Sequence, residues 1–244
     1  MATQKVFKRY ELKYVLTREQ KERLVSLMES YMTPDKYGRT NIRNIYFDTP
    51  DYRLIRNSIE KPVFKEKLRI RSYGKAAADS PVYVELKRKC DHVVYKRRVE
   101  MSEQEAMRWI CGGGYVAGRS DYGRKQISGE IDYFLGYYGN LAPAAFISYD
   151  RQAYYAKDDK DFRVTFDENI LCRQTDLSLK SEAYGMPVLE GDKILMEIKC
   201  AGGMPMWMVK FLSEEHIYKT SFSKYGTAYR KYIWPGTQEV AIYA

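Results

Sequence analysis

The sequence predicts an α+β fold in which an antiparallel β-sheet carries helices, and two observations lead to that prediction. First, several segments alternate charged and apolar side chains with the period of two that is typical of half-buried strands, for example Val82 to Lys87. Second, Thr17 and Ser102 each begin a capping-box pattern that starts a helix between such strands. No internal repeat or Pro/Ser-rich linker divides the chain, so we expect one domain over residues 1–244.

The expected elements follow from these patterns in chain order. Strands are expected at about 5–16, 41–48, 63–73, 82–90, 93–101, 144–156, 161–171 and 192–200. Helices are expected from Thr17 to about Tyr31, shortly after Thr49-Pro50 with Tyr52 in it, from Ser102 to Gly112-Gly113-Gly114, at 125–138, from a first turn that contains Pro205, and at 223–233. Turns at 74–81 and at Asp91-His92 join three of the strands into an antiparallel meander.

Charge and residue types narrow the function. The chain has 244 residues with 41 Lys and Arg against 32 Asp and Glu, and its net charge of +9 favours anionic partners such as phosphates, nucleic acid or an acidic membrane surface. The four Cys include no Cys-x-x-Cys pair and there are only two His, which argues against a zinc site, a disulfide scaffold and a catalytic triad. No stretch is long and apolar enough to span a bilayer, and the default location is a reducing cytoplasm.

Charged side chains share one face of several expected strands, because residues two apart in a strand point the same way. The charged pairs with this spacing are Glu11 and Lys13, Arg69 and Arg71, Glu85 and Lys87, Lys96 and Arg98, and Glu197 and Lys199, with Arg163, Thr165 and Asp167 sharing a face of a further strand. The opposite faces are apolar, as in Leu68 and Ile70 or in Met196 and Ile198. One face of the sheet is therefore expected to be charged.

Such a face has an ordinary interpretation, the solvated side of a half-buried sheet with cross-strand ion pairs. Here, however, Arg, Lys and Glu fill nearly every position, whereas solvated faces usually mix in Thr, Ser, Gln and Asn. If the sheet closes, the charges point into a lumen, where repulsion between like charges is costly unless an anion compensates. Arg and Lys are the usual phosphate ligands, and carboxylates can hold a divalent cation that bridges phosphates, so we expect a metal-bound phosphate ligand.

Short motifs along the chain occur in an order that resembles one family. They are Tyr10-Glu-Leu-Lys-Tyr14, Ile45-Tyr-Phe-Asp-Thr49, Leu68-Arg-Ile-Arg71, Val84-Glu-Leu-Lys87, Tyr149-Asp-Arg151, Phe162-Arg163, Met196-Glu-Ile-Lys199 and Phe222-Ser-Lys-Tyr225. In this order they resemble the VTC domain, the catalytic module of eukaryotic polyphosphate polymerases, within the CYTH-like triphosphate tunnel metalloenzyme superfamily. The resemblance spans nearly the whole chain.

The resemblance implies a closed eight-stranded antiparallel β tunnel with helices packed on the outside. It also implies transfer of the γ-phosphate of ATP to a growing polyphosphate chain, with Mn²⁺ or Mg²⁺ as cofactor and with ATP and inorganic polyphosphate or triphosphate as ligands. The residues expected to be catalytic, nearly all by match to phosphate-binding positions, are Lys13, Arg69, Arg71, Lys87, Arg151, Arg163, Lys199 and Lys224. Glu197 matches the metal-binding carboxylate, and further substrate contacts are expected from Glu11, Arg43, Glu85 and Arg98.

Two departures from the family pattern leave alternatives open. Ser221 stands where a further basic residue is expected, and the membrane and SPX-like segments of eukaryotic subunits are missing, so any membrane association would need a separate partner. The same scaffold also serves inorganic or nucleoside triphosphatases and non-catalytic polyphosphate-binding subunits. A nucleic-acid binder fits the charge but lacks a helix-turn-helix, zinc-finger or RNP-like pattern, so no nucleic acid is expected. Glu11 and Glu85 fit either further metal ligands or ion-pair partners, and Lys224 also fits a helix-surface lysine.

Overall fold

The structure, a computed structural model, describes residues 10–60, 62–91, 93–113 and 122–234. The chain folds into two compact units. Unit 1 consists of the described parts of 1–41, 149–170 and 189–223, and unit 2 of the described parts of 42–148, 171–188 and 224–244. The single domain expected over residues 1–244 stays a prediction.

The secondary structure alternates groups of strands with helices. The strands are β1 (Tyr10–Leu16), β2 (Met32–Pro34), β3 (Thr40–Asp48), β4 (Phe64–Tyr73), β5 (Pro81–Cys90), β6 (Val93–Ser102), β7 (Ala142–Ala156), β8 (Arg163–Arg173), β9 (Met186–Pro187) and β10 (Ile194–Cys200). The helices are α1 (Arg18–Met28), α2 (Arg53–Ile59), α3 (Glu103–Arg108), α4 (Tyr122–Tyr138), α5 (Met206–Glu214) and α6 (Lys224–Ala228), and the π-helical turns η1 (Trp109–Gly113) and η2 (Tyr229–Ile233) follow α3 and α6. The expected α+β class is confirmed.

Hydrogen bonds join the strands in the order β1-β10-β8-β7-β3-β4-β5-β6, with β2 on β7 and β9 on β8. This is an open order of ten strands through the described residues, so the closed eight-stranded sheet that the resemblance implies is not confirmed. The extra strands are short, and they pair with the two longest strands, β7 of 15 residues and β8 of 11 residues.

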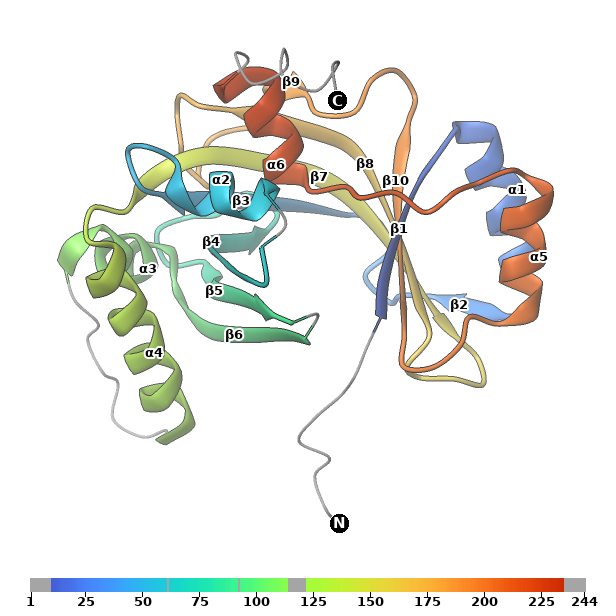
Figure 1. The fold of residues 1–244 in the computed structure, drawn as a ribbon, viewed down its shortest axis with the longest axis horizontal. Coiled ribbons are helices and arrows are strands. Elements are labelled where there is room, and N and C mark those ends of the chain that lie inside the picture. The colour runs from blue at the N-terminus through green and yellow to red at the C-terminus, as the bar shows by residue number, and fades with distance from the viewer. Residues whose placement is uncertain (1–9, 61, 92, 114–121, 235–244) are drawn as a thin grey trace. The chain divides into compact units, whose positions relative to one another are not determined.

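Unit 1 buries its apolar strand face under two helices. One buried cluster packs residues of β1, β8 and β10 against residues of α1 and α5. Its members include Leu16, Leu24, Met28, Val164, Phe166, Met196, Ile198, Met208 and Phe211. Helices α1 and α5 lie side by side (Figure 1), and Tyr31 stacks on Trp207 next to them with ring centroids 4.6 Å apart. The capping box expected at the start of α1 is confirmed, since Thr17 and Gln20 bond to each other's backbone N–H.

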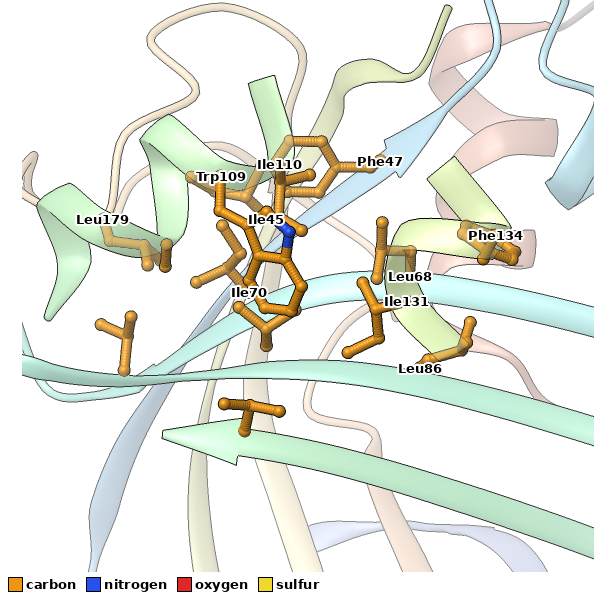
Figure 2. Packing of buried hydrophobic residues seen from close by; sticks show 14 of the residues in the cluster. Ile45, Phe47, Leu68, Ile70, Leu86, Trp109, Ile110, Ile131, Phe134 and Leu179 are labelled. Atoms are coloured by element: carbon orange, nitrogen blue, oxygen red, sulfur yellow. The ribbon is translucent and has the colours of Figure 1, made fainter. Parts of the chain in front are cut away.

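Unit 2 buries the apolar face of β3, β4 and β5 under α3, η1 and α4. Figure 2 shows Trp109 and Ile110 packing near Ile45 and Ile70 in this core. Even-numbered residues supply the apolar side chains of the cluster, namely Leu68 and Ile70 of β4 and Val82, Val84 and Leu86 of β5. The odd-numbered residues of the same strands therefore lie on the other face of the sheet.

The carboxylate of Asp48 organises the start of α2. Its Oδ1 accepts hydrogen bonds from the backbone N–H groups of Thr49 at 2.9 Å and Leu54 at 2.8 Å. Its Oδ2 accepts from the N–H of Ile55 at 3.0 Å and from the hydroxyl of Tyr225 at 3.0 Å. Asp48 thus supplies the cap that the residue at the helix start lacks, and it ties β3 to α6.

Some boundaries differ from expectation. Helix α1 ends at Met28 rather than near Tyr31, and a turn over residues 29–31 leads into β2, where Met32 pairs with Ala156 of β7. Tyr52 precedes α2 instead of lying within it, since its φ of 58° is left-handed. Residues 5–9 of the first expected strand, His92 of an expected turn and Gly114 of an expected helix end lie outside the described residues.

We expect Asp48→Ala to destabilise the protein by about 3 kcal/mol, because buried N–H groups and the hydroxyl of Tyr225 would lose their acceptor. Urea unfolding followed by circular dichroism measures the loss. Asp51→Ala is the matched control, since Asp51 lies exposed in the same turn and its removal should cost only about 0.5 kcal/mol. Equal losses in the two variants would contradict this role for Asp48.

Candidate anion-binding site

The charged face of unit 2 is formed by the odd-numbered residues of β4 and β5 and by the even-numbered residues of β6. The antiparallel registers place Arg69, Glu85 and Arg98 directly opposite one another. Arg71 lies two residues further along β4 and therefore on the same face. The structure thus brings these four residues together, as the strand periodicity predicts.

Glu85 is the centre of this face. Its side chain is only 1% exposed, and it accepts hydrogen bonds from Arg69 Nε at 2.8 Å and from Arg98 Nε at 2.7 Å. Lys96 Nζ lies 2.7 Å from the same carboxylate, and Arg71 Nε lies 3.9 Å from it. One buried carboxylate therefore gathers several cationic side chains around itself.

These cations dominate the electrostatics at Glu85. Burial by itself raises the pKa of a carboxyl group, but the neighbouring Arg69, Arg71 and Lys96 hold the pKa of Glu85 far below its usual range. Burial lowers the pKa of Lys96 to about 8, although Glu85 acts in the opposite direction. The cluster keeps its carboxylate ionised and has more positive than negative groups, which suits an anionic ligand.

Uncharged side chains from β3 orient two of the arginines. The hydroxyl of Tyr46 accepts a hydrogen bond from Arg69 Nη1 at 3.0 Å. Asn44 Oδ1 accepts one from Arg71 Nε at 3.0 Å, and Asn44 Nδ2 donates to the carbonyl of Ile147 at 2.9 Å. The guanidinium groups are therefore held in fixed orientations before any ligand binds, which favours tight recognition.

A row of lysines extends this face along the strands. Lys87 lies directly opposite both Lys67 on β4 and Lys96 on β6, and in the next row Lys65 lies opposite Lys89. Like charges directly opposite one another destabilise a sheet. Glu85 compensates Lys96 in the first of these rows, and together the lysines give this part of the face an excess of positive charge.

Two of the sequence motifs meet beside this face. Tyr225 of α6 stacks on Tyr46 of β3 with ring centroids 4.8 Å apart. Burial raises the pKa of Tyr46, but the guanidinium groups of the face and the ammonium of Lys224 bring it below its usual value. Lys224 therefore lies close enough to act on the electrostatics of the face.

Arg43 is not part of this face. It shares strand parity with Ile45 and Phe47, whose side chains lie in the core of unit 2. Its Nη1 donates to the carbonyl of Ser181, and its Nη2 lies 3.9 Å from Glu182. The structure therefore separates Arg43 from the arginines of β4, and its observed contacts hold the loop that follows β8.

Unit 1 carries a second charged face. Lys13 Nζ lies 3.4 Å from Glu11 and 3.7 Å from Glu197, and it donates to the carbonyl of Phe222 at 2.9 Å. Glu197 also accepts a hydrogen bond from Arg151 Nη2 at 3.3 Å. The structure thus brings Glu11, Lys13, Arg151 and Glu197 together.

The remaining residues of this second face come from β8 and β10. Asp167 binds Arg151 through two hydrogen bonds of 2.6 and 2.7 Å. Lys199 lies opposite Arg163, and burial lowers the pKa of Lys199. The guanidinium of Arg163 lies over the ring of Tyr155 at 4.8 Å, so the aromatic ring supports its orientation.

The carboxylates of unit 1 suit a metal ion only if a ligand supplies further oxygens. No group of three or more His, Cys, Asp or Glu side chains that could hold a metal lies within the described residues. Glu11 and Glu197 nevertheless converge on the ammonium of Lys13, so their oxygens face a common cationic position. One or two carboxylates together with phosphate oxygens and waters are the usual donor set of Mg²⁺, and these residues fit that set.

Some contributors were not among the expected site residues. Strand parity placed Lys96 and Asp167 on charged faces from the sequence, but no role in the site was expected for them. Asn44 and Tyr46 have no such signal, because their contacts depend on the register of β3 with β4.

Comparisons with known proteins identify the family and the fold. The model of the VTC domain family matches residues 8–233. Among solved structures, a candidate adenylate cyclase from Bacillus halodurans aligns with a TM-score of 0.52 at 16% identity, over 87% of this chain and 92% of that chain. At 16% identity, this structural similarity shows only that the two chains share a fold. No curated protein matches the chain.

Two further structures align more weakly. A candidate adenylate cyclase from Vibrio parahaemolyticus gives a TM-score of 0.45 at 10% identity, over 91% of this chain and 97% of that chain. The Mimivirus capping-enzyme triphosphatase gives 0.33 at 8% identity, over 84% of this chain and 88% of that chain. Among the described helices, none is both long and apolar enough to cross a membrane.

We expect Glu85→Gln to cost about 3 kcal/mol of stability, because the cations around it would lose their buried partner. Because the folded pKa of Glu85 is depressed, its contribution is present above the unfolded pKa of about 4.3 and is lost as pH falls below it. Urea unfolding at neutral and acid pH should therefore show a smaller acid loss in the variant. Glu100→Gln, an exposed change on the same face, is the control. An unchanged acid dependence in Glu85→Gln would contradict the assignment.

We expect Arg43→Ala to lower stability by about 2 kcal/mol, since its loop contacts are lost, but to leave affinity for inorganic tripolyphosphate unchanged. Arg69→Ala, on the charged face, should weaken that affinity about tenfold. Isothermal titration calorimetry compares the two variants. If Arg43→Ala weakens binding as much as Arg69→Ala does, the separation of Arg43 from the site is wrong.

Proposed function

Because the chain belongs to the VTC domain family, we propose that it is a metal-dependent polyphosphate polymerase that transfers the γ-phosphate of ATP to a growing polyphosphate chain. The observation that carries the proposal is the cation-rich face of unit 2, whose arginines are held in place around Glu85. The closed eight-stranded tunnel belongs to the same proposal. We also propose a cytoplasmic location, in which any association with a membrane depends on a separate partner.

The chemistry needs positioning and charge stabilisation more than covalent help from the protein. Arg69, Arg71 and Arg98 bind the triphosphate oxygens, and the lysine rows bind further phosphates. A terminal oxygen of the acceptor chain forms a bond to the γ-phosphorus while the bond from that phosphorus to the bridging oxygen breaks, and ADP leaves. Because the acceptor oxygen is already ionised, no histidine base is needed.

The residues of unit 1 supply the metal-binding part of the proposal. Glu197 holds Mn²⁺ or Mg²⁺, with Glu11 as a second carboxylate, and the ion neutralises phosphate charge when bound. Lys13, Arg151, Arg163 and Lys199 bind phosphate oxygens. Asp167 orients Arg151 through its paired hydrogen bonds.

Incubation of the purified protein with ATP and Mn²⁺ or Mg²⁺ tests the reaction. We expect long-chain polyphosphate and ADP, seen by gel electrophoresis and by nucleotide chromatography. Orthophosphate with no polymer would instead indicate a triphosphatase. Tight polyphosphate binding without turnover, across metals and nucleotides, would indicate a non-catalytic binding subunit.

We expect Glu197→Gln to lower turnover about a hundredfold or more, because the amide is a poor ligand for the metal ion. Glu214→Gln, an exposed change on α5, is the matched control and should leave turnover unchanged. Thermal unfolding of both variants checks the fold. Full activity in Glu197→Gln at every metal concentration would remove Glu197 from the proposal.

A further inference from the structure

Two tyrosines lie at one end of the cationic face of unit 2. Tyr83 lies directly opposite Arg71, and Tyr73 lies two residues beyond Arg71 on the same face of β4. The lysine rows lie at the other end of this face, beyond Arg69 and Glu85. The face therefore carries two tyrosines with Glu100 beside them at one end, and mainly lysines, with Val94 opposite Lys89, at the other.

The ring of Tyr73 is both held in place and half exposed. Its hydroxyl accepts a hydrogen bond from Arg98 Nη2 at 3.1 Å. Its ring meets that of Tyr83 edge to face, with centroids 5.6 Å apart and planes at 78°. Arg98 in turn lies over the ring of Tyr83 at 4.2 Å, yet the residue Tyr73 keeps 49% of its surface accessible.

Exposed tyrosines are common on protein surfaces, and most need no special explanation. Tyr73 differs because the same arginine that binds its hydroxyl also binds Glu85, so the ring is coupled to the group of side chains that faces the phosphates. Nucleobases commonly stack on aromatic rings, and nearby arginines add cation–π contacts. This stacking does not depend on which base is present.

We propose that Tyr73, supported by Tyr83 and Arg98, is a stacking platform for the base of a nucleoside triphosphate whose phosphates lie over Arg71 and Arg69. This inference rests on the proposed function and adds to it the nucleoside end of the site. Because Lys67 lies six positions before Tyr73 along β4, about 20 Å separate the level of Tyr73 from the first lysine row, with Arg71 and Arg69 between them. A nucleotide stacked on Tyr73 therefore directs its γ-phosphate toward Lys67, Lys87 and Lys96.

This orientation assigns different tasks to the two kinds of cation. Arginine forks bind phosphates in fixed, often bidentate geometry, so they suit a nucleotide that must be aligned for reaction. Lysine acts as a mobile point charge and suits a polymer that has to move past it by one unit after each transfer. The growing chain accordingly lies over the lysine rows.

Isothermal titration calorimetry on the full chain tests the platform with three metal-bound probes: ATP, ribose 5-triphosphate and inorganic tripolyphosphate. In the wild type, ATP should bind about tenfold or more tightly than ribose 5-triphosphate, since only ATP has a base. Tyr73→Ala should remove that difference and leave tripolyphosphate affinity unchanged, whereas Tyr73→Trp should keep it. Tyr95→Ala is the matched control, because Tyr95 is 50% exposed on the opposite face of β6.

The outcomes separate this inference from the function on which it rests. If wild-type protein binds ATP and ribose 5-triphosphate equally, the platform is wrong while the triphosphate site stands. If Tyr73→Ala weakens ATP and tripolyphosphate alike, Tyr73 acts by positioning Arg98 and not by stacking. If the wild type binds none of the three probes, both the proposed function and the platform fail. The wild-type comparison decides the question even if Tyr73→Ala does not fold.

Discussion

A carboxylate can be buried at Glu85 only because cations surround it, and the charged face of unit 2 is arranged around that requirement. Taking an ionised carboxyl group out of water costs several kcal/mol unless partners and hydrogen bonds compensate. Arg69, Lys96 and Arg98 all approach within hydrogen-bonding distance. The carboxylate in turn fixes side chains that would otherwise be long and mobile. The buried carboxylate therefore depends on the cations, and the fixed positions of the cations depend on the carboxylate.

The two charged faces differ in their balance of charge, and their chemistry should differ accordingly. Around Glu85 one carboxylate is in contact with several cations, and rows of lysines extend the positive charge. In unit 1 the carboxylates Glu11, Asp167 and Glu197 lie among the cations. A face with surplus positive charge suits phosphate alone, whereas a mixed face suits phosphate together with a cation.

Strand periodicity carried most of what could be predicted from the sequence. It placed Arg69, Arg71, Glu85, Lys87 and Arg98 on one face, because alternation by two is a local property of any strand. The same rule argues against Arg43, which shares parity with the core residue Ile45. Periodicity within a strand says nothing about its register with a strand distant in sequence. The contacts of Asn44 and Tyr46 with the arginines could therefore not be predicted. The pairing of β2 and β9 with longer strands depends on the same long-range information, and so does closure of the sheet into a tunnel.

Each unit is assembled from three separated stretches of chain, and β7 and β8 contribute residues to both. A ribosome delivers these stretches one after another, so unit 2 lacks Tyr225 until nearly the whole chain has been synthesised. The usual order in which an N-terminal domain folds before the next is made does not apply to such an arrangement. Contacts between distant stretches also slow folding, because long loops must close first. The apolar core of unit 1 in particular stays incomplete until α5 has been synthesised, and neither unit corresponds to one continuous stretch of the chain.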